Sequence, residues 1–239
     1  MKSVVVMPLL AAALFAAACG GDGDPTAVDT TARVRFFNAT TGMTGGGGFT
    51  TNGQFAPGSA LAFGQSTQAC ATVNAGLTSL GFGAANTAGT GLSGNALSTL
   101  NNQSITAGGN YTVVATGSAT SPTLFLLDNS ISGSLGTNQA AVRFVNLAPG
   151  TGTTANTFVV FTGTIGAGGT ITAIDIAVGS PTTFNTVASG PNAFTILNDH
   201  EIVIVGSAAT LNLQGGTVNT VAIVPIESGG FQLINIQRC

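Results

Sequence analysis

The stretch Ala32-Arg-Val-Arg-Phe-Phe-Asn38 returns 108 residues later as Ala140-Ala-Val-Arg-Phe-Val-Asn146. Two further pairs of stretches repeat at the same offset: Gly108-Gly-Asn-Tyr-Thr-Val-Val114 with Gly216-Thr-Val-Asn-Thr-Val-Ala222, and Leu124-Phe-Leu-Leu127 with Gln232-Leu-Ile-Asn235. A solenoid repeat has roughly 20–50 residues, whereas a period of 108 residues suits a small sandwich domain. The chain is therefore predicted to contain two copies of one unit.

Between these stretches the two copies match only loosely. Val73-Asn-Ala-Gly76 resembles Val187-Ala-Ser-Gly190 only if the offset grows to 114, which insertions in the connecting loops would explain.

The composition favours strands over helices. Hydrophobic residues make up 44% of the 239 residues and charged residues 5%, against roughly 25% charged in an ordinary soluble domain. Threonine and valine suit pleated strands, and the 35 glycines suit the turns between them. With no convincing helix after residue 18, we predict an all-β chain of two tandem antiparallel β-sandwich modules after a signal peptide. The predicted strands are 33–38, 49–55, 60–63, 69–74, 77–82, 103–106, 110–117, 123–128, 141–146, 157–163, 170–178, 183–188, 193–197, 201–206, 209–213, 218–225 and 231–237.

The order of these motifs resembles DUF4397, a bacterial family of tandem immunoglobulin-like modules. The resemblance rests on Val-Arg-Phe-x-Asn in the opening strand, an Ala-Gly turn, and Ala-Gly-Gly-Asn-Tyr-Thr-Val-Val before a leucine-rich strand. Tyr111 to Val114 carry the motif in the first unit, whereas the second unit has Asn219 in place of the tyrosine. The resemblance covers residues 32–239 and implies modules at 32–136 and 137–239, but no biochemical activity.

The amino terminus has the layout of a secretory signal. A basic start with Lys2 precedes an apolar run, and three alanines lead directly to Cys19. The apolar run is too short for a transmembrane helix, which needs about 20 residues. We predict that residues 1–18 form a lipoprotein signal peptide, that Cys19 is lipidated and that residues 19–31 form a flexible tether. The alternative is an ordinary signal peptide that is cut before Cys19 and leaves a free thiol.

Three cysteines suggest one pair and one modified residue. If Cys19 carries a lipid, Cys70 and Cys239 remain, and in an oxidising envelope we predict that they form a disulfide. The alternative is two separate thiols, one buried and one at a frayed end.

Two arginines stand out because the chain has so few charges. Arg35 and Arg143 occupy equivalent places in the opening strands and share a face with Phe37 and Val145 respectively, away from Val34 and Phe36 or Val142 and Phe144. We predict that each arginine has a structural role, with Asp128 and Asp175 as candidate partners. The alternative is that the arginines form part of a ligand site.

Other motifs do not point to catalysis, a metal or a cofactor. Asp199-His200-Glu201 contains the only histidine, but three consecutive residues of an extended chain cannot all face one ion. The four glycines at 45–48 lack the lysine and the helix of a phosphate loop. The two carboxylates of Asp22 and Asp24 make a poor calcium site.

These observations predict a non-enzymatic, lipid-anchored protein of the bacterial cell envelope, a structural or binding module. Gly20 after Cys19 favours the outer membrane. Partners would be the membrane and envelope proteins or polysaccharide. Nucleic acid is excluded, because the only lysine is Lys2 and cations are not clustered. A surface adhesin or glycan-binding protein is the first alternative, and an unrecognised hydrolase that uses His200 is the second.

Overall fold

The structure is a computed structural model that describes residues 30–148, 158–162, 170–173, 176–198, 208–226 and 230–239. These ranges contain strands and no helix, and hence no helix long and apolar enough to cross a membrane. The strands are β1 (Thr31–Thr41), β2 (Gly47–Thr51), β3 (Gln54–Phe55), β4 (Gln65–Ser66), β5 (Ala71–Asn74), β6 (Gly76–Ala84), β7 (Ser98–Ile105), β8 (Asn110–Ser118), β9 (Ser121–Asp128), β10 (Gln139–Asn146), β11 (Phe158–Thr162), β12 (Thr170–Ala173), β13 (Asn185–Ala188), β14 (Gly190–Asn198), β15 (Ala209–Leu213), β16 (Val218–Pro225) and β17 (Phe231–Gln237).

Each half of the chain builds two sheets. In the first half one sheet has the order β4-β1-β8-β9, with β5 also paired to β1, and the other has the order β3-β2-β6-β7. In the second half the orders are β13-β10-β16-β17 and β12-β11-β14-β15. We call the sheets around β1 and β10 the inner sheets and the other two the outer sheets. Among the described residues, no sheet contains strands from both halves.

The inner sheets are mixed, so the predicted wholly antiparallel arrangement is wrong for them. β1 runs parallel to β8, and β10 runs parallel to β16, whereas every other pair of these strands is antiparallel. Parallel neighbours need a long crossover connection, which here passes through the outer sheet of the same half. Apolar residues alternate along a strand in the same way whether its neighbour runs parallel or antiparallel. The sequence therefore could not predict the two parallel pairs.

Three predicted strands differ from the structure, and a fourth lies outside the described residues. The predicted strand 49–55 is two strands, β2 and β3, separated by a turn at Asn52 and Gly53. Residues 60–63 are not a strand, because Leu61 makes only an isolated bridge with Gly47, and the local strand is β4 at 65–66. Of the predicted strand 170–178, β12 covers Thr170–Ala173. The predicted strand 201–206 lies outside the described residues.

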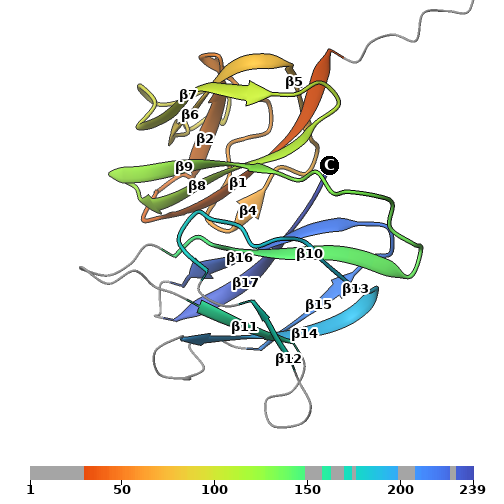
Figure 1. Cartoon of the computed structure of the whole chain (residues 1–239). Coiled ribbons are helices and arrows are strands. Elements are labelled where there is room, and N and C mark those ends of the chain that lie inside the picture. The colour runs from red at the N-terminus through yellow and green to blue at the C-terminus, as the bar shows by residue number, and fades with distance from the viewer. Residues whose placement is uncertain (1–29, 149–157, 163–169, 174–175, 199–207, 227–229) are drawn as a thin grey trace, which may run out of the picture.

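The four sheets stack in layers, as Figure 1 shows. The outer sheet of the first half lies at one end, the two inner sheets lie in the middle, and the outer sheet of the second half lies at the other end. Within each half the inner and outer sheets enclose an apolar core, in the manner of a β-sandwich. In the first half, Phe36 from β1 packs against Phe49 from β2, with ring centroids 5.0 Å apart. In the second half, Phe144 from β10 packs against Phe194 from β14 at 5.2 Å.

The register of the inner sheets defines how the two halves correspond. Val34 pairs with Tyr111 and Val142 with Asn219, so β1 and β8 map onto β10 and β16 at the predicted offset of 108. The offset of 114 predicted for the turn is also met, because Ala32 pairs with Val73 as Ala140 pairs with Val187.

The predicted offset of 108 for the last strand is wrong by one residue. Ala115 pairs with Leu124, whereas Ile223 pairs with Leu233, so β9 maps onto β17 at an offset of 109. The paired residues Ile223 and Leu233 are one residue further apart in sequence than Ala115 and Leu124. A slip of one residue would exchange the two faces of a strand, and only the offset of 109 places Leu124 and Leu233 in equivalent cores.

Asn38 and Asn146 hold the same junction in the two halves. The Asn38 Nδ2 donates to the carbonyl of Leu61 at 2.8 Å, and its Oδ1 accepts from the Thr40 N–H at 2.9 Å. The Asn146 Nδ2 donates to the carbonyl of Ile176 at 3.0 Å, and its Oδ1 accepts from the Ala148 N–H at 2.9 Å. Both asparagines are fully buried. Each one fastens the end of an opening strand to the loop beside it.

Replacing either asparagine by alanine should lower the free energy of unfolding by about 1–3 kcal/mol, because a buried backbone N–H loses its acceptor. Chemical denaturation of N38A and N146A would measure this, with the exposed Asn74→Ala in β5 as the control. A change in N38A or N146A no larger than that in the control would refute the junction role.

A third apolar cluster joins the two halves. It combines Leu147, which directly follows β10, with residues of the inner sheets on their faces away from the outer sheets: Phe37, Ala39, Val114, Leu127, Val145, Ala222, Val224 and Ile236. All of these side chains are buried. We call this set the junction cluster. Because both inner sheets are covered on two faces, their strands contain consecutive apolar residues instead of strict alternation.

The two halves use the same surface at this junction, in an approximate two-fold arrangement. A Cβ atom at Gly64 would lie 3.1 Å from Ile234 Cδ1, and a Cβ atom at Gly179 would lie 2.1 Å from Phe125 Cε1. Gly64 corresponds to Gly179, and Phe125 corresponds to Ile234. A side chain of each half therefore packs against a glycine of the other half. Such reciprocal contacts are typical of a self-complementary interface.

Candidate functional site

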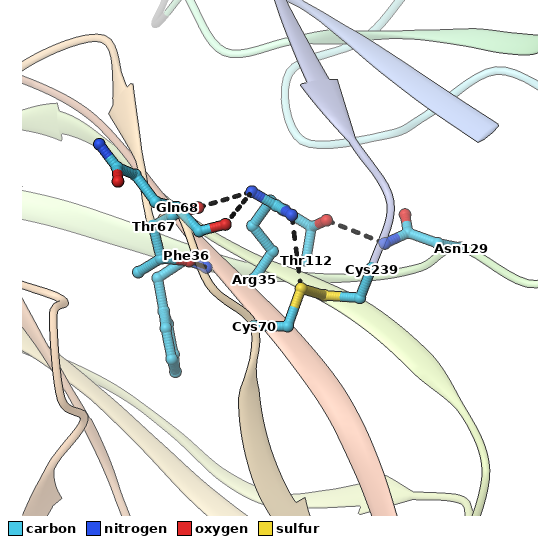
Figure 2. The surroundings of a disulfide bond; sticks show 8 residues. All are labelled: Arg35, Phe36, Thr67, Gln68, Cys70, Thr112, Asn129 and Cys239. Atoms are coloured by element: carbon cyan, nitrogen blue, oxygen red, sulfur yellow. Dashed lines mark hydrogen bonds between the residues drawn. A yellow bond between two sulfur atoms is a disulfide. The ribbon is translucent and has the colours of Figure 1, made fainter. Parts of the chain in front are cut away.

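A disulfide crosses the junction at one edge. Cys70 and Cys239 are bonded with an S–S distance of 2.07 Å and lie 169 residues apart in sequence. Cys70 lies immediately before β5 of the first half, not in mid-strand, and Cys239 follows β17 of the second half. The predicted disulfide is present, and it fastens the end of the second half to the first (Figure 2).

Arg35 lies beside this disulfide. Its Nη1 donates to the carbonyl of Thr67 at 2.6 Å and more weakly to that of Gln68 at 3.5 Å, and its Nη2 lies 3.4 Å from the sulfur of Cys70. Figure 2 shows the guanidinium between these carbonyls and the sulfur. Its buried Nε has no hydrogen-bond partner in the described part of the chain. Burial lowers the pKa of Arg35. Its partners are thus backbone carbonyls and a sulfur, not a carboxylate.

Arg143 occupies the equivalent place in the second half and is more deeply buried. Its Nε donates to the hydroxyl of Thr220 at 3.0 Å, and its Nη2 donates to Oδ1 of Asn129 at 2.7 Å. The guanidinium carbon lies 4.5 Å from the centre of the Phe184 ring, within the range of a cation–π contact. Burial lowers the pKa of Arg143 to about 10, and the nearby negative charge of Asp128 partly opposes this shift.

Asn129 links the two halves through Arg143. Its Nδ2 donates to the hydroxyl of Thr112 in β8 at 2.9 Å, while its Oδ1 accepts from Arg143 in β10. Arg238 adds a long hydrogen bond of 3.5 Å to the Asn129 carbonyl. Another polar contact crosses the junction where the Thr116 hydroxyl donates to the carbonyl of Leu147. Arg143 is therefore an arginine of the interface between the halves.

The arginine partners were only partly predictable. Asp128 is close enough to affect the pKa of Arg143, but no ion pair joins the two among the described residues, and Asp175 lies outside them. Asn129 and Phe184 were missed: Asn129 lies in a polar stretch after a strand, and Phe184 lies just before β13, at a position predicted as part of the strand 183–188. One signal was available: Phe184 corresponds to Cys70 at the offset of 114, so a large side chain replaces the disulfide beside the second arginine.

A surface cavity of about 480 Å³ opens beside Arg143. Arg143, Phe184, Asp128 and several hydroxyl side chains line it, together with Ile131 and Leu135 from the segment between the halves. The lining of this cavity combines a buried cation, a carboxylate, hydroxyl groups and an aromatic ring. Another cavity, of about 460 Å³, is lined by residues between 57 and 69 and has no charged side chain in its lining.

The remaining sequence candidates lie outside the described residues: Cys19, Asp22, Asp24, and Asp199-His200-Glu201. Within the described ranges, no three His, Cys, Asp or Glu side chains gather as metal ligands would.

Comparison with known proteins adds a family but no activity. No curated protein matches the chain. A crystal structure of a "putative cell adhesion protein" from Bacteroides ovatus aligns over 87% of this chain and 96% of its own, with 8% identity and a TM-score of 0.25. The family described as "Domain of unknown function (DUF4397)" matches residues 32–155, the whole first unit and the opening strand of the second. Because that match covers more than half of the sequence, the chain belongs to the DUF4397 family.

Proposed function

We propose that this protein is a non-enzymatic, lipid-anchored component of the bacterial cell envelope, whose two immunoglobulin-like modules act together as one stiff body. The observation that supports this most strongly is the disulfide between Cys70 and Cys239. Disulfides persist in oxidising compartments such as the periplasm and cell surface, and are rare in the cytosol. A bond between the two modules also suits a body that must keep its shape outside the cell.

Mechanical stiffness is the second element of the proposal. Two modules joined only by a linker would move independently, because interfaces between domains are usually small and polar. Here a junction cluster of nine buried apolar residues lies between them, with a disulfide at its edge. The pair would thus transmit position and force as a single unit, as a spacer or scaffold in the envelope requires.

The lipid anchor follows from the cysteine count. The disulfide uses Cys70 and Cys239, and Cys19 is the remaining cysteine. Its place after three alanines suits lipid attachment, and an anchor with more than one acyl chain gives stable membrane binding. Gly20 supports the outer membrane as the destination.

We expect mass spectrometry of the amino-terminal peptide, from protein isolated out of its native membranes, to show Cys19 as the first residue and to carry acyl chains. Cys19→Ala should move the protein from the membrane to the soluble envelope fraction, because the anchor is lost. Cys70→Ala is the matched control and should stay in the membrane. A Cys19 peptide with an unmodified thiol would contradict the anchor.

A second candidate, an adhesin or glycan-binding protein, is favoured by one observation. The cavity beside Arg143 presents hydroxyl groups, a carboxylate and an aromatic ring together, a combination suited to polar ligands.

A further inference from the structure

We propose that the cavity beside Arg143 binds an acidic sugar, meaning a saccharide unit that carries a carboxylate. The inference deepens the glycan-binding candidate above and does not depend on the lipid anchor. It starts from the charge of Arg143, because that side chain is only 5% exposed and yet lines an open cavity.

The first step concerns the charge. Burying a cation is costly unless a counter-charge or a full set of hydrogen bonds compensates for it. Arg143 has no ion pair within the described part of the chain, and its Nη1 donates no hydrogen bond there. Its Nε and Nη2 are held by Thr220 and Asn129, which fix the plane of the guanidinium. The remaining donors are thus oriented in advance, and a carboxylate matches the geometry of a guanidinium.

The second step concerns the rest of the lining. Asp128 also borders the cavity, and its Oδ1 is occupied by the backbone N–H and hydroxyl of Ser130 at 2.8 and 2.6 Å. The carboxylate of Asp128 repels a ligand that is only an anion, but it accepts hydrogen bonds from ligand hydroxyl groups. Thr183 and Ser132 add further hydroxyls, whereas the Thr182 hydroxyl is held by the Phe144 N–H and the Thr183 carbonyl. The lining therefore favours a ligand with both a carboxylate and hydroxyl groups over a simple ion.

The third step is a comparison with the equivalent place in the first half. There the Nη atoms of Arg35 are directed to the carbonyls of Thr67 and Gln68 and to the sulfur of Cys70. The cavity lined by residues between 57 and 69 in that half has no charged side chain in its lining. Both Nη atoms of Arg35 thus contact other atoms of the protein, whereas Nη1 of Arg143 donates no hydrogen bond within the described residues. Within the described residues, the site is therefore assigned to Arg143 of the second half and not to Arg35 of the first.

The test uses ligand-observed saturation-transfer NMR on the full mature protein in detergent. Glucuronate and galacturonate are the probes, with glucose, galactose and acetate as comparisons. We expect saturable binding of the sugar acids, and binding at least about tenfold weaker for the neutral sugars and for acetate, the size expected when charge-assisted hydrogen bonds are lost.

Two variants locate the binding. Thr183→Trp places a large side chain at an exposed position of the cavity lining, where folding does not depend on it, and should abolish binding. Gln68→Trp is the matched control, because Gln68 is exposed and is the equivalent residue of the first half, and it should bind like the wild type. Arg143→Lys keeps the charge but loses the planar fork, and should weaken binding by about tenfold.

Three results would overturn the proposal: equal binding of neutral and acidic sugars, equal binding of acetate, or unchanged binding in T183W. None of them would affect the anchor, which the Cys19 peptide tests separately. Absence of sugar binding in a protein with lipidated Cys19 would thus refute the site and leave the envelope role standing.

Discussion

Phe37→Ala is expected to lower the free energy of unfolding by about 3–5 kcal/mol, the usual cost of deleting a buried phenylalanine. Phe37 is fully buried in the junction cluster, between the inner sheets of the two modules. The loss is large compared with the total stability of a protein, which is typically about 5–15 kcal/mol. Because the cluster belongs to both modules, the variant should weaken their docking as well as the first module. Urea unfolding followed by circular dichroism would measure the change.

Leu77→Ala provides the control for Phe37→Ala. Leu77 lies in β6 of the same module but is 72% exposed, so its removal should change stability by no more than about 0.5 kcal/mol. If Phe37→Ala cost less than about 1 kcal/mol, the inner sheet of the first module would not be packed against a partner surface.

Removing the disulfide should have a comparable effect. The bond closes a loop defined by a sequence separation of 169 residues, and the chain-entropy relation gives about 5 kcal/mol for such a loop, less any strain in the folded state. The variant with both Cys70→Ala and Cys239→Ala should therefore unfold at a lower urea concentration than the wild type. The junction cluster remains, so we expect the variant to fold and to keep the modules docked.

The controls for this experiment separate the bond from the residues. Wild-type protein treated with a reductant should match the double variant, and Cys19→Ala should match the oxidised wild type. Equal stability of the reduced and oxidised wild type would show that the bond does not restrain the unfolded chain. In that case its role in locking the modules would have to be abandoned.

Much of the fold was accessible from the sequence because it is repeated. The opening strands, the equivalent asparagines Asn38 and Asn146, and the turn that ends at Gly76 or Gly190 could be aligned without a structure. The local physics is the same in both copies, since equivalent strands bury equivalent faces and equivalent turns use glycine or asparagine. The disulfide followed from the cysteine count, which left a single pair.

The junction between the modules was not predicted, although a signal for it exists. Val221, Ala222, Ile223 and Val224 are consecutive apolar residues in β16, and all are buried. Such a run indicates a strand that is covered on both faces, whereas β15 alternates between more and less exposed residues as an outer strand does. The pattern shows that something covers the inner sheet, but it does not name the partner surface.

The cavity beside Arg143 was out of reach for a different reason. Arg143 itself was recognisable, as a rare charge in a repeated motif. Its surroundings come from Asn129 and Asp128 at the end of the first module and from Phe184 in a loop of the second. These segments meet only because the modules dock face to face. A cavity that forms between two docked modules cannot be predicted from the sequence until their docking is known.

The central claim is that the two modules pack through the same face in an approximate two-fold arrangement. Nuclear Overhauser effects in the oxidised protein test it most directly. We predict cross-peaks between the α protons of Gly64 and the δ1 methyl group of Ile234, and between those of Gly179 and the ring of Phe125. If both were absent while cross-peaks between Phe36 and Phe49 within the first module were present, the modules would be folded but not docked in this way, and the account would be contradicted.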